Sequence, residues 1–480
     1  MKKLLLMLAF GIGSLGYAQA NCAGALAIAS GSTTTVASYT GTFVGTCAGT
    51  GQATTPFAMW YKYTPTANGE ITVSSNLIQN DGVLKSNDTR LSIITGLCTA
   101  LTCYGGNDDV SGTNYLSSTT VPVSAGTTYY IVWDNRWSAL GFDFTLNFVA
   151  VPCIRPNEFS ITTPTNITAT SATVGWTAAI GTPASYDVQH GPSGFTLGTG
   201  TTQNTTTISA PLAGLPAGGN HSYYVRSNCG ATQSAWTGPF SIFLAKSAPH
   251  SNSFEQPDLA NGFGGTGWSL SEGAANAQQG TIFYFSNTST TAVSNSQLYS
   301  RAFNFSAGET VSFNFWTKPV PTTGTGTIKV YYNTTKSLTG ATAVGAVINV
   351  AGLAYVQQTR SFTAPAAGVY YLIFSNESPI AAAATSLLLD NFNLSSVLGT
   401  SEEVKHSNIF LSVYPNPTND ILNIKSDLKI KNVSIVDMSG RNMNVKLEDN
   451  KVDVRNLTPG AYMINIETKD GISTEKFIKK

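Results

Sequence analysis

The sequence predicts an all-β protein built from tandem β-sandwich or jelly-roll domains, followed by a small C-terminal β-sandwich. Short apolar runs separated by Gly, Asn and Asp turns recur along the chain, and residues 142–148 alternate strictly between apolar and polar side chains. No window shows the 3.6-residue period of an amphipathic helix. Charged residues make up 11% and apolar residues 42% of the chain, a composition typical of extracellular β-sandwich proteins and unlike that of disordered chains.

The length of the chain and the distribution of its charges indicate how it is divided into domains. Its 480 residues are enough for about three domains of ordinary size. The 26 basic and 26 acidic side chains leave a formal net charge of zero, which argues against a nucleic-acid partner because such a binder needs a basic surface. In residues 401–480, 23 of 80 side chains are charged, against 27 of 380 in residues 21–400. This rise in charge density predicts a domain boundary near residue 400.

Residues 1–20 have the pattern of a signal peptide. Two lysines precede an apolar run over residues 4–15, and the A-x-A cleavage pattern follows at 18–20. We expect cleavage after Ala20, so that the mature chain begins at Asn21. A transmembrane anchor is the alternative, but the run is shorter than the roughly 20 residues that a span requires. Because no later run is long and apolar enough, the mature protein is not expected to span a membrane.

Six cysteines in an exported chain predict disulfide bonds, although the sequence alone does not determine the pairing. The grouping along the chain suggests the pairs Cys22-Cys47, Cys98-Cys103 and Cys153-Cys229. Closing the long 153–229 loop should stabilise the fold by roughly 4 kcal/mol. A zinc site is the alternative, but the chain has no C-x-x-C pair and no histidine near a cysteine cluster.

Residues 21–150 carry four features of a known kind of secreted module. These are an aromatic strand at 60–63, two cysteines at 98 and 103, an acidic turn at 107–109 and a strand at 125–131. In this order they resemble the jelly-roll modules of the pre-peptidase C-terminal or CUB-like kind. The resemblance implies a secreted jelly roll, a fold in which structural calcium is common.

Residues 153–246 resemble a fibronectin type III domain. Residues 171–176 match its second strand with the core tryptophan, and 185–189 match its third strand. The family places a tyrosine at the position of His221, so the usual tyrosine corner is expected to be altered. The resemblance implies a spacer, with a binding module as the alternative.

Residues 249–397 form another predicted strand-rich block. An opening Ser-Phe-Glu at 253–255, a Gly-rich turn leading to Trp268 and a closing strand at 387–392 resemble MAM-like or carbohydrate-binding-module jelly rolls. Apolar and polar residues alternate over 311–316 and 328–332, which is typical of strands with one buried face.

Residues 401–480 resemble the type A C-terminal sorting domain of the type IX secretion system of Bacteroidota. The matching motifs are residues 413–418, residues 457–462 and the basic C-terminal segment 475–480. The resemblance implies export through that secretion machinery and removal of the domain after export. An ordinary Ig-like domain at the end of the chain is the alternative.

Motifs for catalysis are not found in the sequence. None of the four histidines has H-E-x-x-H spacing, and there is no G-x-S-x-G nucleophile elbow. Residues 262–267 match G-x-G-x-x-G, but a strand pattern follows where a dinucleotide site requires a helix. No pair of carboxylates in 249–397 stands out as a glycosidase pair. We therefore expect a protein that is not an enzyme.

Candidate binding residues lie in turns and on the polar face of strands. Asp108 and Asp109 occupy a Gly- and Asn-rich turn and are candidates for calcium ligands, with solvated turn residues as the alternative. Trp137 lies in a polar loop, where its ring could stack on a sugar, anchor a partner protein or fold back over the sandwich. Trp316 and Tyr331 occupy the polar phase of their strands and could form an aromatic platform, or pack against the opposite sheet.

These features together predict an exported, non-catalytic protein for adhesion or ligand binding at the cell surface or in the medium. Its expected partners are the type IX secretion machinery and either glycans or surface proteins. A polysaccharide-binding accessory protein is the leading alternative, and an uncharacterised secreted hydrolase is the weaker one.

Overall fold

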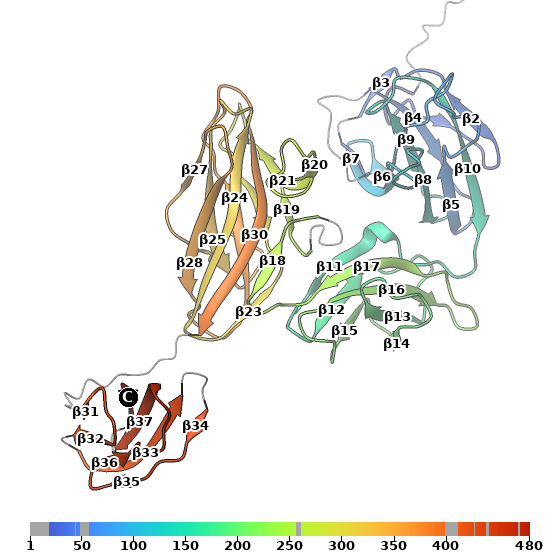
Figure 1. The fold of residues 1–480 in the computed structure, drawn as a ribbon. Helices are drawn as coiled ribbons and strands as arrows, with labels where there is room; N and C mark the ends of the chain where they lie inside the picture. Colours follow the sequence, from blue (N-terminus) through green and yellow to red (C-terminus); the bar gives the residue numbers. More distant parts are fainter. Residues whose placement is uncertain are drawn as a thin grey trace, which may run out of the picture. The chain divides into compact units, whose positions relative to one another are not determined.

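The fold is all-β, which confirms the predicted class. A computed structural model describes residues 19–43, 45–48, 57–255, 261–398, 411–426, 428–437, 441–468 and 471–480 (Figure 1). The expected signal-peptide segment 1–18 lies outside the described residues. Within them, regular structure consists of strands and one short 3-10 helix, η1 Glu158–Ser160. The chain divides into two compact units at residue 400.

The first sandwich packs a six-stranded sheet, with the order β1-β4-β9-β6-β7 and β3 paired to β4, on a four-stranded sheet of order β2-β10-β5-β8. Its strands are β1 Leu26–Ala27, β2 Thr33–Val36, β3 Gly41–Thr42, β4 Phe57–Tyr63, β5 Gly69–Ser74, β6 Arg90–Leu97, β7 Ala100–Asn107, β8 Ser118–Val123, β9 Tyr129–Asp134 and β10 Phe142–Ala150. Along β10, Phe142, Phe144 and Leu146 enter the core, where they pack with Trp133. This is the buried face that the alternation predicted.

The disulfide pairing in the first sandwich differs from the predicted pairing. Cys22 bonds to Cys98 and Cys47 bonds to Cys103, so the pairs Cys22-Cys47 and Cys98-Cys103 are wrong. Cys98 lies at the turn of the β6–β7 hairpin, whereas Cys103 lies along β7 opposite Ile94. A strand advances about 3.3 Å per residue, so these two cysteines are too far apart for the 4.4–6.8 Å Cα separation that a disulfide usually needs. Both instead face the N-terminal segment.

The second sandwich packs a three-stranded sheet, β11-β12-β15, on a four-stranded sheet, β14-β13-β16-β17. Its strands are β11 Ile161–Thr165, β12 Ala172–Trp176, β13 Ser185–Pro192, β14 Thr201–Thr205, β15 Ser209–Leu212, β16 Asn220–Asn228 and β17 Thr237–Phe243. Trp176 packs on Tyr186 in the core. His221 is buried, and its ring nitrogens have no hydrogen-bond partner among the described residues. The bridge Cys153–Cys229 is the pair that the sequence grouping suggested.

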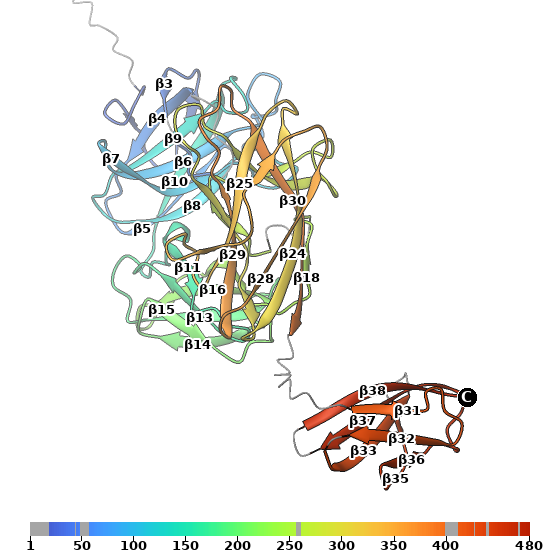
Figure 2. The ribbon, with the colours of Figure 1, turned by 90° about the vertical axis from the view of Figure 1, so that its left-hand side faces the viewer.

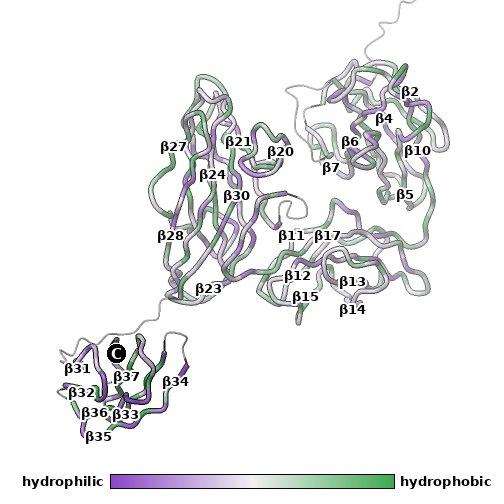
Figure 3. Tube along the Cα trace, in the orientation of Figure 1, coloured by the Kyte–Doolittle hydropathy of each residue, from purple (hydrophilic) through white to green (hydrophobic). Residues whose placement is uncertain are grey.

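The third sandwich packs a six-stranded sheet, β20-β21-β30-β24-β28 with β18 on β30, against a seven-stranded sheet, β19-β22-β29-β25-β26 with β23 on β29 and β27 on β25. Its strands are β18 His250–Asn252, β19 Gly264–Thr266, β20 Ser269–Glu272, β21 Ile282–Asn287, β22 Ser296–Tyr299, β23 Phe303–Phe305, β24 Glu309–Val320, β25 Gly326–Asn333, β26 Thr342–Ala343, β27 Ile348–Val350, β28 Val356–Thr363, β29 Gly368–Asn376 and β30 Ser386–Leu398. Burial alternates along the whole of β24, where Val311, Phe313 and Phe315 face the core. Figure 3 shows that hydrophilic and hydrophobic residues follow one another along the strands of this sandwich. The intervening side chains face outward.

The C-terminal unit is a smaller sandwich of two four-stranded sheets, β31-β32-β36-β35 and β34-β33-β37-β38. Its strands are β31 Leu411–Tyr414, β32 Ile421–Ser426, β33 Ile430–Asp437, β34 Asn442–Met443, β35 Leu447–Glu448, β36 Lys451–Asp453, β37 Gly460–Thr468 and β38 Gly471–Lys479. The last two strands lie side by side (Figure 2). Tyr462 of β37 stacks on Phe477 of β38. The final strand therefore contributes to this small core.

Replacing Cys153 and Cys229 together by alanine should lower the free energy of unfolding of the second sandwich by about 4 kcal/mol. The bridge joins residues 76 positions apart, so its loss gives the unfolded chain the entropy of a long open loop. Calorimetry of the full chain should show the transition of the unit formed by residues 1–399 at lower temperature and that of the C-terminal unit unchanged. Peptide mapping without reduction should recover Cys22 joined to Cys98, and a Cys98–Cys103 peptide would contradict the structure.

Candidate functional site

Three loops of the first sandwich meet at one end of its sheets. We call them the first-sandwich loop end: residues 75–89 after β5, 108–117 after β7 and 135–141 after β9. Asn114 Nδ2 donates to Asn76 Oδ1 at 3.1 Å, which joins the first two loops. The Ser86 amide donates to the Gly141 carbonyl at 2.8 Å, which joins the first and third. Residues far apart in sequence therefore form one surface.

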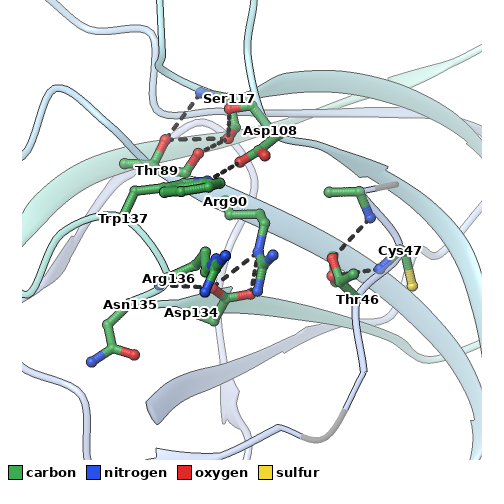
Figure 4. Close-up of polar contacts among 12 residues, drawn as sticks. Thr46, Cys47, Thr89, Arg90, Asp108, Ser117, Asp134, Asn135, Arg136 and Trp137 are labelled. Atoms are coloured by element: carbon green, nitrogen blue, oxygen red, sulfur yellow. Dashed lines mark hydrogen bonds and ion pairs between the residues drawn. The ribbon is translucent and has the colours of Figure 1, made fainter. Parts of the chain in front are cut away.

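A buried ion pair lies beneath this surface (Figure 4). Arg90 of β6 stands opposite Asp134 of β9 in the sheet register, and its Nε donates to Oδ1 at 3.1 Å and Oδ2 at 2.9 Å. Both side chains are almost completely buried, and burial raises the pKa of the Asp134 carboxyl in spite of the adjacent guanidinium. Asp134 also accepts the Arg136 amide at 3.0 Å, so the pair fixes the start of the third loop.

Trp137 stays at the surface of this end and does not fold back into the core. The residue is 48% exposed, and its indole Nε1 donates to Asp108 Oδ1 at 2.9 Å. The Arg136 guanidinium carbon lies 4.6 Å from the ring centroid, a cation–π distance. The ring is thus held in place by a carboxylate at its edge and a cation over one face.

The predicted calcium ligands lie at this end but have different environments. Asp108 is buried and accepts the Trp137 indole, whereas Asp109 is exposed. Burial and the charge of Asp108 raise the pKa of Asp109. Burial and the charges of Asp108 and Asp109 raise the pKa of Asp88 to about 6. In the described part of the chain, no group of three or more His, Cys, Asp or Glu could hold a metal ion. Calcium binding by Asp108 and Asp109 stays a prediction.

The loop end also exposes large apolar side chains. Ile78 is 97% exposed and Leu84 is 86% exposed, and Val83 lies in the same loop. Tyr115 and Leu140 of the other two loops are also exposed. Large exposed apolar groups gathered on adjoining loops are typical of surfaces that bind a partner.

The second candidate surface lies on the third sandwich around Trp316. Trp316 occupies the outward phase of β24 and is partly buried, whereas its neighbours Phe315 and Thr317 are buried. Gln357 of β28 stands opposite Trp316, and Asn393 of β30 stands opposite Asn314. Residues opposite each other in antiparallel strands share a face of the sheet. We call this surface, formed by Asn314, Trp316, Lys318, Tyr355, Gln357 and Asn393, the Trp316 face.

A network of amide groups and a cation–π contact organise the Trp316 face. Asn393 Nδ2 donates to Asn391 Oδ1 at 3.1 Å and to Asn314 Oδ1 at 3.3 Å. Lys318 Nζ lies 5.3 Å from the centroid of the Tyr355 ring. Apart from Lys318, the named residues of this face are uncharged, so the face offers hydrogen-bonding groups and aromatic rings with little net charge.

The β20–β21 loop, residues 273–281, is anchored at one end of the Trp316 face. The buried Asp390 carboxylate accepts the Gln278 amide at 2.7 Å and the Gln279 amide at 3.1 Å. Tyr355 donates its hydroxyl to the Asn276 carbonyl at 2.7 Å. Burial raises the pKa of Asp390 to about 6, although these amides act in the opposite direction. Asp390 therefore positions the loop beside the Trp316 face.

Tyr331 does not join Trp316 in one platform. It lies on β25, in the seven-stranded sheet, whereas Trp316 lies in the six-stranded sheet of the same sandwich. Its hydroxyl donates to Glu377 Oε1 at 2.6 Å, and Lys329 Nζ lies 5.1 Å from its ring centroid. The predicted pair of aromatic residues is thus divided between opposite outer faces.

Sequence reasoning identified Trp316 but missed the residues beside it. Gln357 and Asn393 reach this face only through the pairing of β24 with β28 and β30. Tyr355 directly precedes β28 and reaches the face beside Lys318. The polar phase of β28, with Gln357, Thr359 and Ser361 exposed, is a weak signal for one solvated face. It does not reveal which strand is the neighbour.

Comparison with protein families identifies the C-terminal unit. The family model described as "Secretion system C-terminal sorting domain" matches residues 412–480. The chain therefore carries a type IX sorting domain and is exported, to the cell surface or into the medium. No helix among the described residues has the length and apolar character to cross a membrane. No curated protein matches the chain.

Solved structures with similar folds include binding modules. The CBM22-1 xylan-binding domain of Paenibacillus barcinonensis Xyn10C is 17% identical, with a TM-score of 0.24, covering 32% of this chain and 97% of that one. The K1 cleaved adhesin domain of Lys-gingipain from Porphyromonas gingivalis W83 is 14% identical, with a TM-score of 0.26, covering 31% and 98%. At these identities and TM-scores the likeness carries no information about the function of this chain.

Asp88→Asn should raise the melting temperature at pH 7.5 and leave it nearly unchanged at pH 4. The folded-state pKa of Asp88 is about 6, against an ordinary value of 3.8, so its ionisation opposes folding as pH rises through this interval. Asparagine cannot ionise and avoids that cost. Thermal unfolding of both proteins across the pH range measures the difference, with Asp81→Asn in the same loop as the control. A gain that is independent of pH would contradict the electrostatic cause.

Proposed function

We propose that this chain is a non-catalytic, exported binding protein whose Trp316 face binds a neutral polysaccharide. The observation that carries the proposal is an outward-facing tryptophan placed by strand register among neutral amide side chains. The type IX sorting domain places such a protein where extracellular polysaccharides occur.

The chemistry of the Trp316 face suits a sugar chain. An indole ring offers an apolar surface for the C–H face of a pyranose ring, and it loses little conformational entropy on binding. The amides of Asn314, Gln357 and Asn393 can each donate and accept hydrogen bonds, as sugar hydroxyls do. Because Lys318 is the one charged residue of the face, a neutral polysaccharide fits better than a polyanion or a polycation.

Two further observations support a binding role. The Asp390 carboxylate is buried and engaged by backbone amides of the β20–β21 loop, so it is a poor candidate for a catalytic acid. The three-and-four-stranded arrangement of the second sandwich supports the fibronectin type III resemblance and hence a spacer role.

Trp316→Ala should weaken binding to a soluble neutral polysaccharide at least tenfold, about 1.4 kcal/mol, because the stacking surface is removed. Affinity electrophoresis or calorimetry of the full chain against soluble xylan, mixed-linkage glucan and, for contrast, an acidic polysaccharide measures the effect. Trp316→Phe should retain part of the affinity.

Tyr331→Ala is the matched control, because it removes an aromatic ring from the opposite sheet of the same sandwich. Equal losses for the two alanine variants, or no neutral polysaccharide bound by the folded wild-type protein, would contradict the proposal.

The first-sandwich loop end supports a second function, adhesion to a partner protein. Its apolar groups are exposed on adjoining loops, and Tyr115 and Trp137 are of the aromatic types that dominate protein interfaces. The carboxylates Asp88 and Asp109 lie beside them, so a partner with a basic rim is favoured.

Ile78→Ser combined with Leu84→Ser should at least halve adhesion of protein-coated beads to immobilised basic proteins such as lysozyme, because the most exposed apolar contacts are lost. Val293→Ser is the control, since Val293 is 62% exposed but lies on the third sandwich. Equal adhesion of the double variant and the wild type would rule out this role of the loop end.

A further inference from the structure

The first two described residues form part of the first sandwich. The Gln19 amide donates to the Gly24 carbonyl at 2.8 Å, and the Gln19 carbonyl accepts the Trp60 amide at 3.0 Å. The Ala20 carbonyl accepts the Thr42 amide at 3.2 Å. Both residues are partly buried. These are backbone bonds, so the two residues must be present for them to form.

Gln19 fills a gap on one side of β4. On that side, β3 pairs with residues 57–58 of β4, and β1 pairs with residues 61–62. The amide of Trp60 lies between the two pairings, and the Gln19 carbonyl is its acceptor. Trp60 is only 4% exposed, so water has little access to this position. A chain without Gln19 would leave a buried backbone donor without its partner.

Gly41 provides room for Ala20. A Cβ atom built on Gly41 would lie 2.1 Å from the Ala20 carbonyl oxygen, and its three nearest neighbours are all Ala20 backbone atoms. The φ angle of Gly41 is not in the left-handed region, so its own backbone conformation does not require glycine. The absence of a side chain at position 41 is thus explained by close packing of the Ala20 backbone.

Two cleavage positions satisfy the small-x-small rule for leader removal. Cleavage after Ala20 uses Ala18 and Ala20, and cleavage after Ala18 uses Gly16 and Ala18. The first position, which the sequence pattern favours, discards both residues that complete the β4 side. We propose instead that the leader is removed after Ala18, so that Gln19 is the first residue of the mature protein. This inference is independent of the proposed function.

A glutamine at the N-terminus has a characteristic reactivity. Its α-amino nitrogen can form a bond to its own side-chain carbonyl carbon, releasing the side-chain nitrogen as ammonia and closing a five-membered lactam. The lactam keeps one N–H and leaves the Gln19 carbonyl, the acceptor of the Trp60 amide, unchanged. A mature chain beginning at Gln19 is therefore expected either as such or lighter by one ammonia.

Expression of the full chain with its own leader in a Gram-negative host, followed by intact-mass analysis of the exported protein, tests the cleavage position. A mass that begins at Gln19, with or without loss of ammonia, supports the proposal. A mass that begins at Asn21 or at any other residue overturns it.

A stability cycle tests the structural reason separately. Chains beginning at Gln19 and at Asn21 are prepared, each with and without Gly41→Ala. The Gln19 chain should melt several degrees higher than the Asn21 chain, because the amides of Trp60 and Thr42 keep their acceptors. Gly41→Ala should lower the melting temperature of the Gln19 chain and have little effect when Ala20 is absent. Equal melting temperatures for the two unsubstituted chains, or an equal effect of Gly41→Ala in both, would overturn the argument.

Discussion

The burial of one face of the long strands between two sheets is the constraint on which the rest of this structure depends. Along β24, Val311, Phe313 and Phe315 enter the core, and each buried side chain of this size contributes roughly 1.5–3 kcal/mol. The intervening residues, Trp316 among them, are released from that requirement. Candidate binding groups therefore lie on the outer faces and in the loops, where side chains of different chemistry can be accommodated without disturbing the core.

Two buried carboxylates connect these cores to the candidate surfaces. Asp134 is paired with Arg90 and accepts a backbone amide of the loop that carries Trp137. Asp390 accepts two amides of the loop beside the Trp316 face. In each case a charge that is costly to bury is used to fix a loop, so the loops on the two surfaces are held in defined positions.

The N-terminal part of the first sandwich depends on covalent and edge interactions more than on long strands. β1 and β3 have two residues each, so their ladders supply few hydrogen bonds. The bridges Cys22–Cys98 and Cys47–Cys103 hold this segment against the β6–β7 hairpin, and Gln19 completes the hydrogen bonding of β4. Such long-range ties compensate for the small number of local contacts.

The sequence by itself determined that the protein is all-β and that it is exported. Strand alternation, as over residues 142–148, follows from the two-residue period of the backbone, and the sorting domain has motifs in a fixed order. Only the tertiary structure decided which cysteines pair, which residues accompany Trp316, and that Tyr331 lies on the other sheet. The physical reason is that alternation is local, whereas strand order and register arise from hydrogen bonds between segments far apart in the chain.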